Sequence, residues 1–175
     1  MVRKTKRNLF LLIVIAGVVV ILDQLTKWLI RQNLAMGEEI YPISAFAPFF
    51  RFTYWKNTGA AFGLFQNANI PLLIMAIIIS AVIIRTYFHM EDEPLLLRIS
   101  LSMMLGGAIG NMIDRITLGY VTDFIAVGRF PVFNIADSSV TVGAFLMLLA
   151  FYLSEREEKK KGVHEAESDQ GPQDA

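Results

Sequence analysis

Four aspartates, Asp23, Asp114, Asp123 and Asp137, lie near the ends of long apolar runs. An ionisable side chain in a membrane segment is costly, so each of the four is a functional candidate. Two aspartates that lie close together can share one proton. One carboxylate then activates a water as general base, while the other carboxyl group protonates or polarises a carbonyl oxygen. This chemistry requires no metal, histidine or cysteine.

Other catalytic chemistries lack the residues that they need. The chain has no cysteine, which excludes disulfides, thiol nucleophiles, thiolate zinc sites and iron–sulfur clusters. Its two histidines, His89 and His164, fall in a short connection and in the polar tail. Neither can easily reach the four aspartates across a bilayer core about 30 Å thick. A Ser-His-Asp triad and a histidine-based zinc site are therefore disfavoured, and we expect neither a metal nor a cofactor.

The favoured pair is Asp123 and Asp137, which are fourteen positions apart, with a segment between them long enough to fold back. Asp123 stands among the apolar neighbours Val121, Phe124 and Ile125, which suggest no structural role for its charge. Asp137 has an alternative role, because Asp is a good helix N-cap and the last apolar run follows it. Capping alone therefore remains open for Asp137.

Other polar residues could support such a pair. Asn111 and Asp114 are three positions apart and share a helix face. Arg115 follows directly and can serve as a charge partner or as a substrate contact. Asp23 and Lys27 are four positions apart on one face of the first apolar run. An ion pair between them would lower the cost of both charges in a membrane, and we favour this supporting role.

Two other functions remain open from the residues alone. Ser138 could be a nucleophile with Lys27 as its base, since both are expected toward the outer side of the membrane. Alternatively, the protein could be a small transporter that uses intramembrane Asp and Lys as a proton relay. The small residues of 106–110 could simply allow two helices to pack closely.

The apolar runs predict the elements that position these side chains. Of the 175 residues, 54% are hydrophobic and 18% are charged, and the mean hydropathy is +0.49. A membrane-spanning helix needs about 20 apolar residues. Runs of this kind occur at about 9–30, 70–88, 95–113 and 138–153. The first run follows four basic residues, as in a secretory signal peptide, but no A-x-A-like cleavage site follows, so we expect an uncleaved helix.

The basic residues predict the orientation, because Lys and Arg gather in cytoplasmic loops. Ten of the sixteen flank the two termini and the connection between the second and third runs, and five lie in the other two segments. With an even number of spans, both termini are therefore expected in the cytoplasm. The polar segment 155–175 is expected to be a disordered tail. The net charge is zero, so nothing indicates nucleic-acid binding.

The segments 31–69 and 114–137 then face outward. The first contains many aromatic residues, which suit a membrane–water interface. An alternation of period two over 50–55 predicts a short strand. We therefore expect an all-α polytopic membrane protein, with four transmembrane helices and a small β element on the outer surface. One membrane domain would cover 1–154.

Five sequence blocks, taken together and in this order, closely resemble the lipoprotein signal peptidase family, or signal peptidase II. They span Asp23 to about Gly143, and the five in order on a four-helix topology are highly specific. The blocks are Asp23-Gln24-Leu25-Thr26-Lys27, Asn57-Thr58-Gly59-Ala60-Ala61-Phe62, Gly106-Gly107-Ala108-Ile109-Gly110-Asn111-Met112-Ile113-Asp114-Arg115, Val121-Thr122-Asp123-Phe124 and Phe133-Asn134-Ile135-Ala136-Asp137-Ser138.

The resemblance implies an aspartic endopeptidase of the bacterial cytoplasmic (inner) membrane, with its active site near the outer face. Its substrates would be prolipoproteins whose future N-terminal cysteine carries a diacylglyceryl group, and it would cut before that cysteine. The family has an extracytoplasmic β cradle with a mobile surface helix, and the cyclic depsipeptide globomycin inhibits it. Membrane lipids are further expected partners, and a monomer would suffice.

The resemblance also assigns roles to individual residues. It implies that Asp123 and Asp137 form the catalytic dyad. The positions that it implies for substrate binding or support are Asp23, Lys27, Asn57, Gly59, Asn111, Asp114, Arg115 and Asn134.

Overall fold

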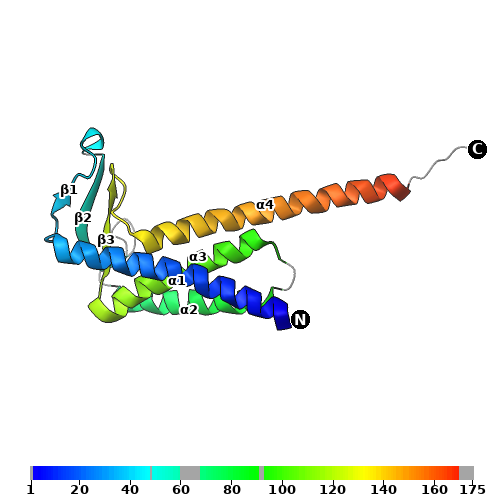
Figure 1. Cartoon of the computed structure of the whole chain (residues 1–175), viewed down its shortest axis with the longest axis horizontal. Helices are drawn as coiled ribbons and strands as arrows, with labels where there is room; N and C mark the ends of the chain where they lie inside the picture. Colours follow the sequence, from blue (N-terminus) through cyan, green and yellow to red (C-terminus); the bar gives the residue numbers. More distant parts are fainter. Residues whose placement is uncertain (1, 48, 60–67, 91–92, 170–175) are drawn as a thin grey trace, which may run out of the picture.

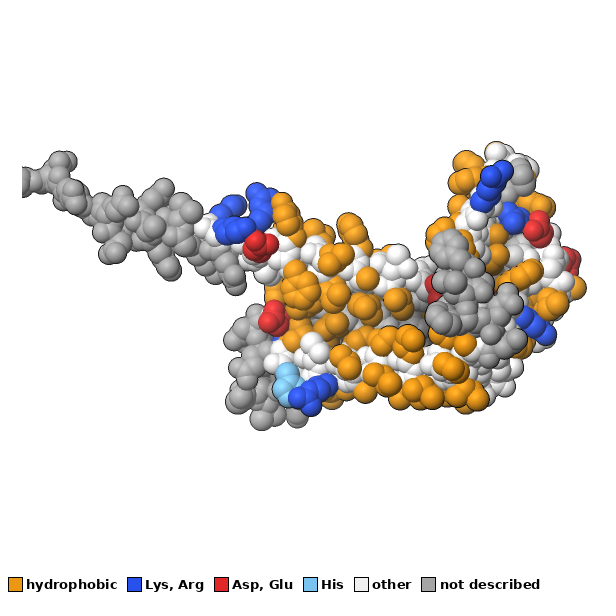
Figure 2. Space-filling view, turned by 180° about the vertical axis from the view of Figure 1, so that it is seen from behind, with side chains coloured by type: hydrophobic (Ala, Val, Ile, Leu, Met, Phe, Trp, Pro, Cys, Tyr) orange, Lys and Arg blue, Asp and Glu red, His pale blue; other side chains and the backbone are white. Residues whose placement is uncertain are grey.

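The structure is a computed structural model that describes residues 2–47, 49–59, 68–90 and 93–169. This part of the chain contains four long helices. They are α1 (Val2–Asn33), α2 (Asn69–His89), α3 (Leu95–Leu118) and α4 (Ile135–Asp169). Each contains a stretch long and apolar enough to span a membrane, with mean hydropathy between 1.4 and 2.5. The four predicted apolar helices are thus confirmed, and hydrophobic side chains cover much of their outer surface (Figure 2).

Helix α3 is the best buried of the four spans, and half of its most apolar window is buried inside the protein. Small residues let its neighbours approach closely. A Cβ atom on Gly106 would lie 2.8 Å from the Cβ of Val19 on α1. A Cβ on Gly107 would overlap the backbone oxygen of Ala136, at the start of α4. The glycines of 106–110 therefore have the packing role that small residues have between membrane helices.

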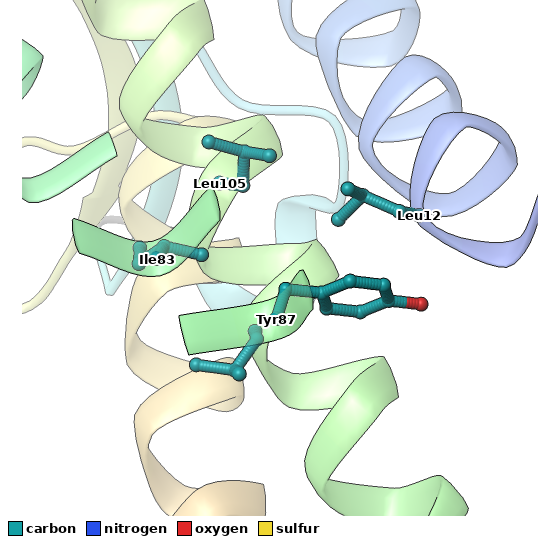
Figure 3. Packing of buried hydrophobic residues seen from close by; sticks show 5 residues of the cluster. Leu12, Ile83, Tyr87 and Leu105 are labelled. Atoms are coloured by element: carbon teal, nitrogen blue, oxygen red, sulfur yellow. The ribbon is translucent and has the colours of Figure 1, made fainter. Parts of the chain in front are cut away.

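A cluster of buried hydrophobic side chains joins α1, α2 and α3 at the end of the bundle that carries the N-terminus (Figures 1 and 3). Its members are Leu12, Ile83, Tyr87, Leu101 and Leu105. Tyr87 is 1% exposed, and its hydroxyl group donates a 2.7 Å hydrogen bond to the backbone oxygen of Asn8. This contact fixes the start of the first span against α2.

A three-stranded antiparallel sheet lies at the other end of the bundle (Figure 1). Its strands, in the order β1–β2–β3, are β1 (Glu39–Ile40), β2 (Phe50–Asn57) and β3 (Val121–Val127). The strand predicted at 50–55 is confirmed as β2, whereas β1 and β3 were not predicted. The only described helix on the sheet side is the 3-10 turn η1 (Ser44–Phe46). Residues 60–62 of the second matched block lie outside the described residues.

The connection from α3 through β3 to α4 sets the positions of the candidate residues. Helix α3 ends at Leu118 and is followed by Gly119, whose φ of +81° is a left-handed conformation that favours glycine. Strand β3 pairs with β2, and the chain then returns so that Phe133 bridges to Ile125 in β3. This return brings the start of α4 back beside β3.

Helix α4 differs from its predicted boundaries. It begins three residues before the predicted run and continues to Asp169, whereas a disordered tail was expected from residue 155. The helix therefore projects well beyond the bundle (Figure 1). On its exposed surface, Glu155 and Lys159 form an ion pair of 2.6 Å with the i, i+4 spacing that favours helix.

Candidate active site

Asp123 and Asp137 are brought together at the sheet end of the bundle. Asp123 lies in the middle of β3, opposite Trp55 of β2, and is 1% exposed. Asp137 lies in the first turn of α4. Both side chains line one cavity of about 790 Å³. The pair expected from the sequence thus faces a common space.

Asn134 joins the two aspartates. Its side-chain Nδ2 donates to Asp123 Oδ1 at 2.6 Å. Its side-chain Oδ1 accepts from the backbone N–H of Asp137 at 2.9 Å, and its own backbone N–H donates to Asp137 Oδ2 at 3.3 Å. This reciprocal pair is a capping box, in which Asn134 is the N-cap and Asp137 the third helical residue. The N-cap of α4 is therefore Asn134 rather than Asp137, and Asp137 contributes only the longer, reciprocal hydrogen bond of the capping box.

Asn111 links Asp137 to the buried lysine. Its Nδ2 donates to Asp137 Oδ1 at 2.7 Å, and its Oδ1 accepts from Lys27 Nζ at 2.9 Å. The same Oδ1 also lies 3.2 Å from Asn134 Nδ2. With its oxygen held by an ammonium donor, the amide of Asn111 has only its N–H groups left to present to Asp137. The orientation of the Asp137 carboxylate is thereby fixed from α3.

The ion pair predicted between Asp23 and Lys27 is present, with Nζ 2.8 Å from Oδ2 and both side chains fully buried. Lys27 also lies 3.4 Å from Asp114 Oδ2. Each of the two carboxylates also accepts a hydrogen bond from a backbone N–H group. Asp23 Oδ1 accepts the backbone N–H of Ala136 at 2.9 Å, and Asp114 Oδ2 accepts that of Thr122 at 2.8 Å. This buried charge cluster therefore holds the backbone next to each catalytic candidate, in α4 and in β3.

The remaining expected residues lie around the cavity. Asn57 Nδ2 donates to Asp123 Oδ2 at 2.9 Å, and its Oδ1 accepts the backbone N–H of Gly59 at 3.0 Å. Arg115 lines the cavity, and its Nη1 lies 3.4 Å from the backbone oxygen of Asn111. The other lining residues are mostly apolar and come from 130–133 and 140–142. The cavity is thus lined mainly by apolar side chains, together with the polar groups of the candidate active site.

Asp123 has the environment of a carboxyl group that keeps its proton near neutral pH. Burial, followed by the nearby charge of Asp137, raises the pKa of Asp123 to about 7. The hydrogen bonds from Asn57 and Asn134 act in the opposite direction and lower this pKa. A raised pKa next to a second carboxylate is the arrangement in which one proton can be shared.

Ser138 and Lys27 are not arranged as a nucleophile and its base. The Ser138 hydroxyl group donates to the backbone oxygen of Asn134 at 2.9 Å, as helix-start serines commonly do. Lys27 Nζ contacts Asp23, Asn111 and Asp114. Each group is therefore engaged elsewhere. Across the described ranges, no three His, Asp or Glu side chains gather as metal ligands would.

Sequence reasoning missed three polar residues of this cluster. Gln24 Nε2 donates to the backbone oxygen of Gly110 at 3.0 Å and lies 3.2 Å from both Asp23 Oδ2 and Asp114 Oδ1. Arg31 Nη1 donates to Thr122 Oγ1 at 3.0 Å. Gln24 lies in the first matched block, which could have indicated its role. Nothing in the sequence relates Arg31 to a threonine in a distant strand.

Comparisons with known proteins agree with this fold. The profile of the family described as Signal peptidase (SPase) II matches residues 15–153. A lipoprotein signal peptidase of Caldanaerobacter subterraneus is 44% identical over 77% of this chain and 91% of its own length. That of Symbiobacterium thermophilum is 43% identical over 82% of this chain and 95% of its own length.

Two solved structures have a similar fold, and both are bacterial membrane enzymes determined by the in meso method. One has a TM-score of 0.76 at 35% identity, covering 82% of this chain and 88% of its own. The other has a TM-score of 0.72 at 36% identity, covering 80% of this chain and 91% of its own. The family match and the four apolar helices together define a multi-pass membrane peptidase. The chain belongs to the signal peptidase II family.

Proposed function

We propose that this protein is an aspartic endopeptidase that removes the signal peptide from diacylglyceryl-modified prolipoproteins, cutting before the lipid-bearing cysteine. The observation that carries the proposal is the pair of buried carboxylates, Asp123 and Asp137, which share Asn134 as a donor and line one apolar cavity. Membership of the signal peptidase II family supports the substrate class.

The proposed reaction is direct attack by water, with one proton held between the two aspartates. The ionised carboxylate takes a proton from the water as its oxygen bonds to the peptide carbonyl carbon. The protonated carboxyl group gives its proton to the carbonyl oxygen, and a tetrahedral diol forms. When the diol collapses, the C–N bond breaks, the leaving amine takes a proton from Asp137, and one diol hydroxyl gives its proton to Asp123, so that the dyad again holds one proton. The raised pKa of Asp123 favours this residue as the proton donor and leaves Asp137 as the base.

The supporting residues act through the two carboxylates and the peptide. Asn111 orients Asp137, and Lys27 orients Asn111. Asn57 holds Asp123 from the side of β2. Arg115 lines the cavity and would offer its N–H groups to backbone carbonyls of an extended peptide. Such fixed donors cost no reorganisation when the peptide reacts.

The apolar surroundings suit a substrate that is already in the bilayer. A slot of about 180 Å³, lined chiefly by side chains of α2 and α3, shares Met75, Asn111, Arg115 and Val140 with the main cavity. An acyl chain or the apolar part of a signal helix would lie there while the scissile bond meets the carboxylates. We propose that the sheet end faces outward, that both termini are cytoplasmic, and that a monomer in the cytoplasmic membrane is sufficient.

The rate of cleavage should depend on pH as expected for a dyad with one proton. Above pH about 7, Asp123 loses its proton, so that two carboxylates remain and none can protonate the carbonyl oxygen. At low pH both are protonated and no base remains. We therefore expect kcat/KM to fall on both sides. The N57A variant loses a hydrogen bond that lowers the pKa of Asp123. The fall of kcat/KM at alkaline pH should therefore occur at higher pH in this variant than in the wild type. A fall of kcat/KM in N57A at the same pH as in the wild type, or at a lower pH, would contradict this assignment.

A cleavage assay on the purified protein tests the proposed function. The substrates are one prolipoprotein with and without its diacylglyceryl group, and products are resolved by gel mobility and by N-terminal mass. We expect cleavage of the lipid-modified form alone, at the bond before the cysteine, and inhibition by globomycin. Equal cleavage of both forms would refute the substrate class, and cleavage of neither would favour transport.

A further inference from the structure

A separate cavity lies at the end of the helical bundle away from the sheet, outside the proposed active site. It has a volume of about 410 Å³ and lies between the beginnings of α1 and α3. Asn8 and Leu95, which both line it, are the first residues of two candidate spans. The cavity therefore lies at the depth where the hydrocarbon of a bilayer meets the headgroups.

A buried arginine forms one side of this cavity. Arg98 is 5% exposed, and its guanidinium carbon lies 5.6 Å from the centroid of the Tyr87 ring. Its Nη2 donates to the backbone oxygen of Met90 at 2.9 Å. Figure 3 shows Tyr87 among the core side chains, with its ring directed toward Leu12 on α1. The guanidinium is thus held on a packed surface, and it presents a fixed positive charge suited to a phosphate group.

A carboxylate and exposed apolar side chains complete the cavity. Glu93 lines it and is exposed, so one cavity presents a positive and a negative group. Phe10 and Leu95 also line it and are 69% and 61% exposed. These two side chains belong to the candidate spans and would face lipid hydrocarbon. Charge of both signs beside an apolar surface matches a zwitterionic lipid rather than a purely anionic one.

We infer that this cavity binds the headgroup of a phospholipid with a primary ammonium group, of the phosphatidylethanolamine type. Arg98 binds the phosphate, Glu93 accepts a hydrogen bond from the ammonium group, and the acyl chains lie along Phe10 and Leu95. Basic pockets at the ends of membrane helices commonly hold lipid headgroups. A choline headgroup has no N–H to donate to Glu93, and a glycerol headgroup has no positive charge.

A lipid titration of the purified full chain in detergent tests this inference. Native mass spectrometry would compare dioleoyl phosphatidylethanolamine, phosphatidylcholine and phosphatidylglycerol, each at several concentrations. We expect the ethanolamine lipid to bind about tenfold more tightly than the other two, the ratio that one charge-assisted hydrogen bond supplies. Equal binding of the three lipids, or tighter binding of phosphatidylglycerol, would overturn the inference.

Two variants separate the roles of the charged groups. Glu93→Gln should abolish the preference for ethanolamine while the lipids still bind, and Arg98→Gln should weaken all three by about tenfold. Arg98 is buried and its replacement could unfold the protein, but Glu93 is exposed, so Glu93→Gln decides the matter alone. Glu155→Gln, an exposed change on α4, is the matched control and should keep the preference. An unchanged preference in Glu93→Gln would overturn the inference.

Discussion

The Asp123→Asn variant is expected to cleave the lipid-modified prolipoprotein at least about a thousandfold more slowly than the wild type, because general acid–base catalysis contributes on this scale. Asparagine has nearly the same size, but its amide cannot take up and release the proton that the reaction moves. The measurement is kcat under conditions of excess substrate, so that an effect on binding does not obscure the chemical step.

The same variant should remain folded, which separates catalysis from stability. Asn57 and Asn134 each donate to one oxygen of Asp123, so the NH2 group of an asparagine at position 123 would face one of these donors, at a cost of about 1 kcal/mol. The variant also no longer has a carboxyl group to desolvate at this buried position, and this gain in stability offsets part of the cost. Glu155→Gln makes the same chemical change on an exposed side chain and should keep full activity. Retention of more than about a tenth of the rate by Asp123→Asn would contradict its assigned role.

The Lys27→Met variant is expected to lower the free energy of unfolding by about 3–5 kcal/mol. It leaves the buried carboxylate of Asp23 without its cation, and that of Asp114 with only the longer ion pair to Arg31, at 3.8 Å. Lys27 lies 2.8 Å from Asp23 and 3.4 Å from Asp114, and the three side chains are almost completely buried. The variant also releases Asn111, so activity should fall as well. The measurement is the unfolding free energy in a fixed detergent, by a denaturant titration.

Two controls test whether the loss comes from unpaired charge. The double variant Lys27→Met with Asp23→Asn removes one of the stranded carboxylates and should recover part of the lost stability. Lys159→Met breaks the exposed pair with Glu155 and should cost less than about 1 kcal/mol, as surface ion pairs do. A loss of less than about 1 kcal/mol in Lys27→Met would show that the buried charges are not mutually stabilising.

The sequence predicted the four helices well because length and hydropathy decide them, and no long-range contact is required. It did not predict β3, although this strand carries Asp123. Five of the seven residues of β3 are buried, so the strand lacks the alternation of buried and exposed positions by which a half-buried strand is recognised. Strand β1 has two residues, which is too short for any periodicity to be read.

Within the site, residue types could be predicted but their partners largely could not. The pair Asp23 and Lys27 follows from a spacing of four, and it is confirmed. The hydrogen bond from the backbone of Ala136 to Asp23 joins residues 113 positions apart, which no local pattern encodes. Asn134 was expected as a supporting residue by resemblance alone. Its bridging of both aspartates depends on the return of the chain after β3, which is a property of the folded structure.

The most direct test of the aspartate dyad compares two adjacent residues in the first turn of α4. Asp137→Asn and Ser138→Ala change neighbouring side chains on the same helix start, and both would be assayed with the wild type on one lipid-modified prolipoprotein under single-turnover conditions. Circular dichroism and thermal unfolding would verify that both variants are folded. We predict that Asp137→Asn cleaves at least about a thousandfold more slowly while Ser138→Ala cleaves at nearly the rate of the wild type. Loss of cleavage in Ser138→Ala with retention in Asp137→Asn would contradict the dyad and make the serine the nucleophile.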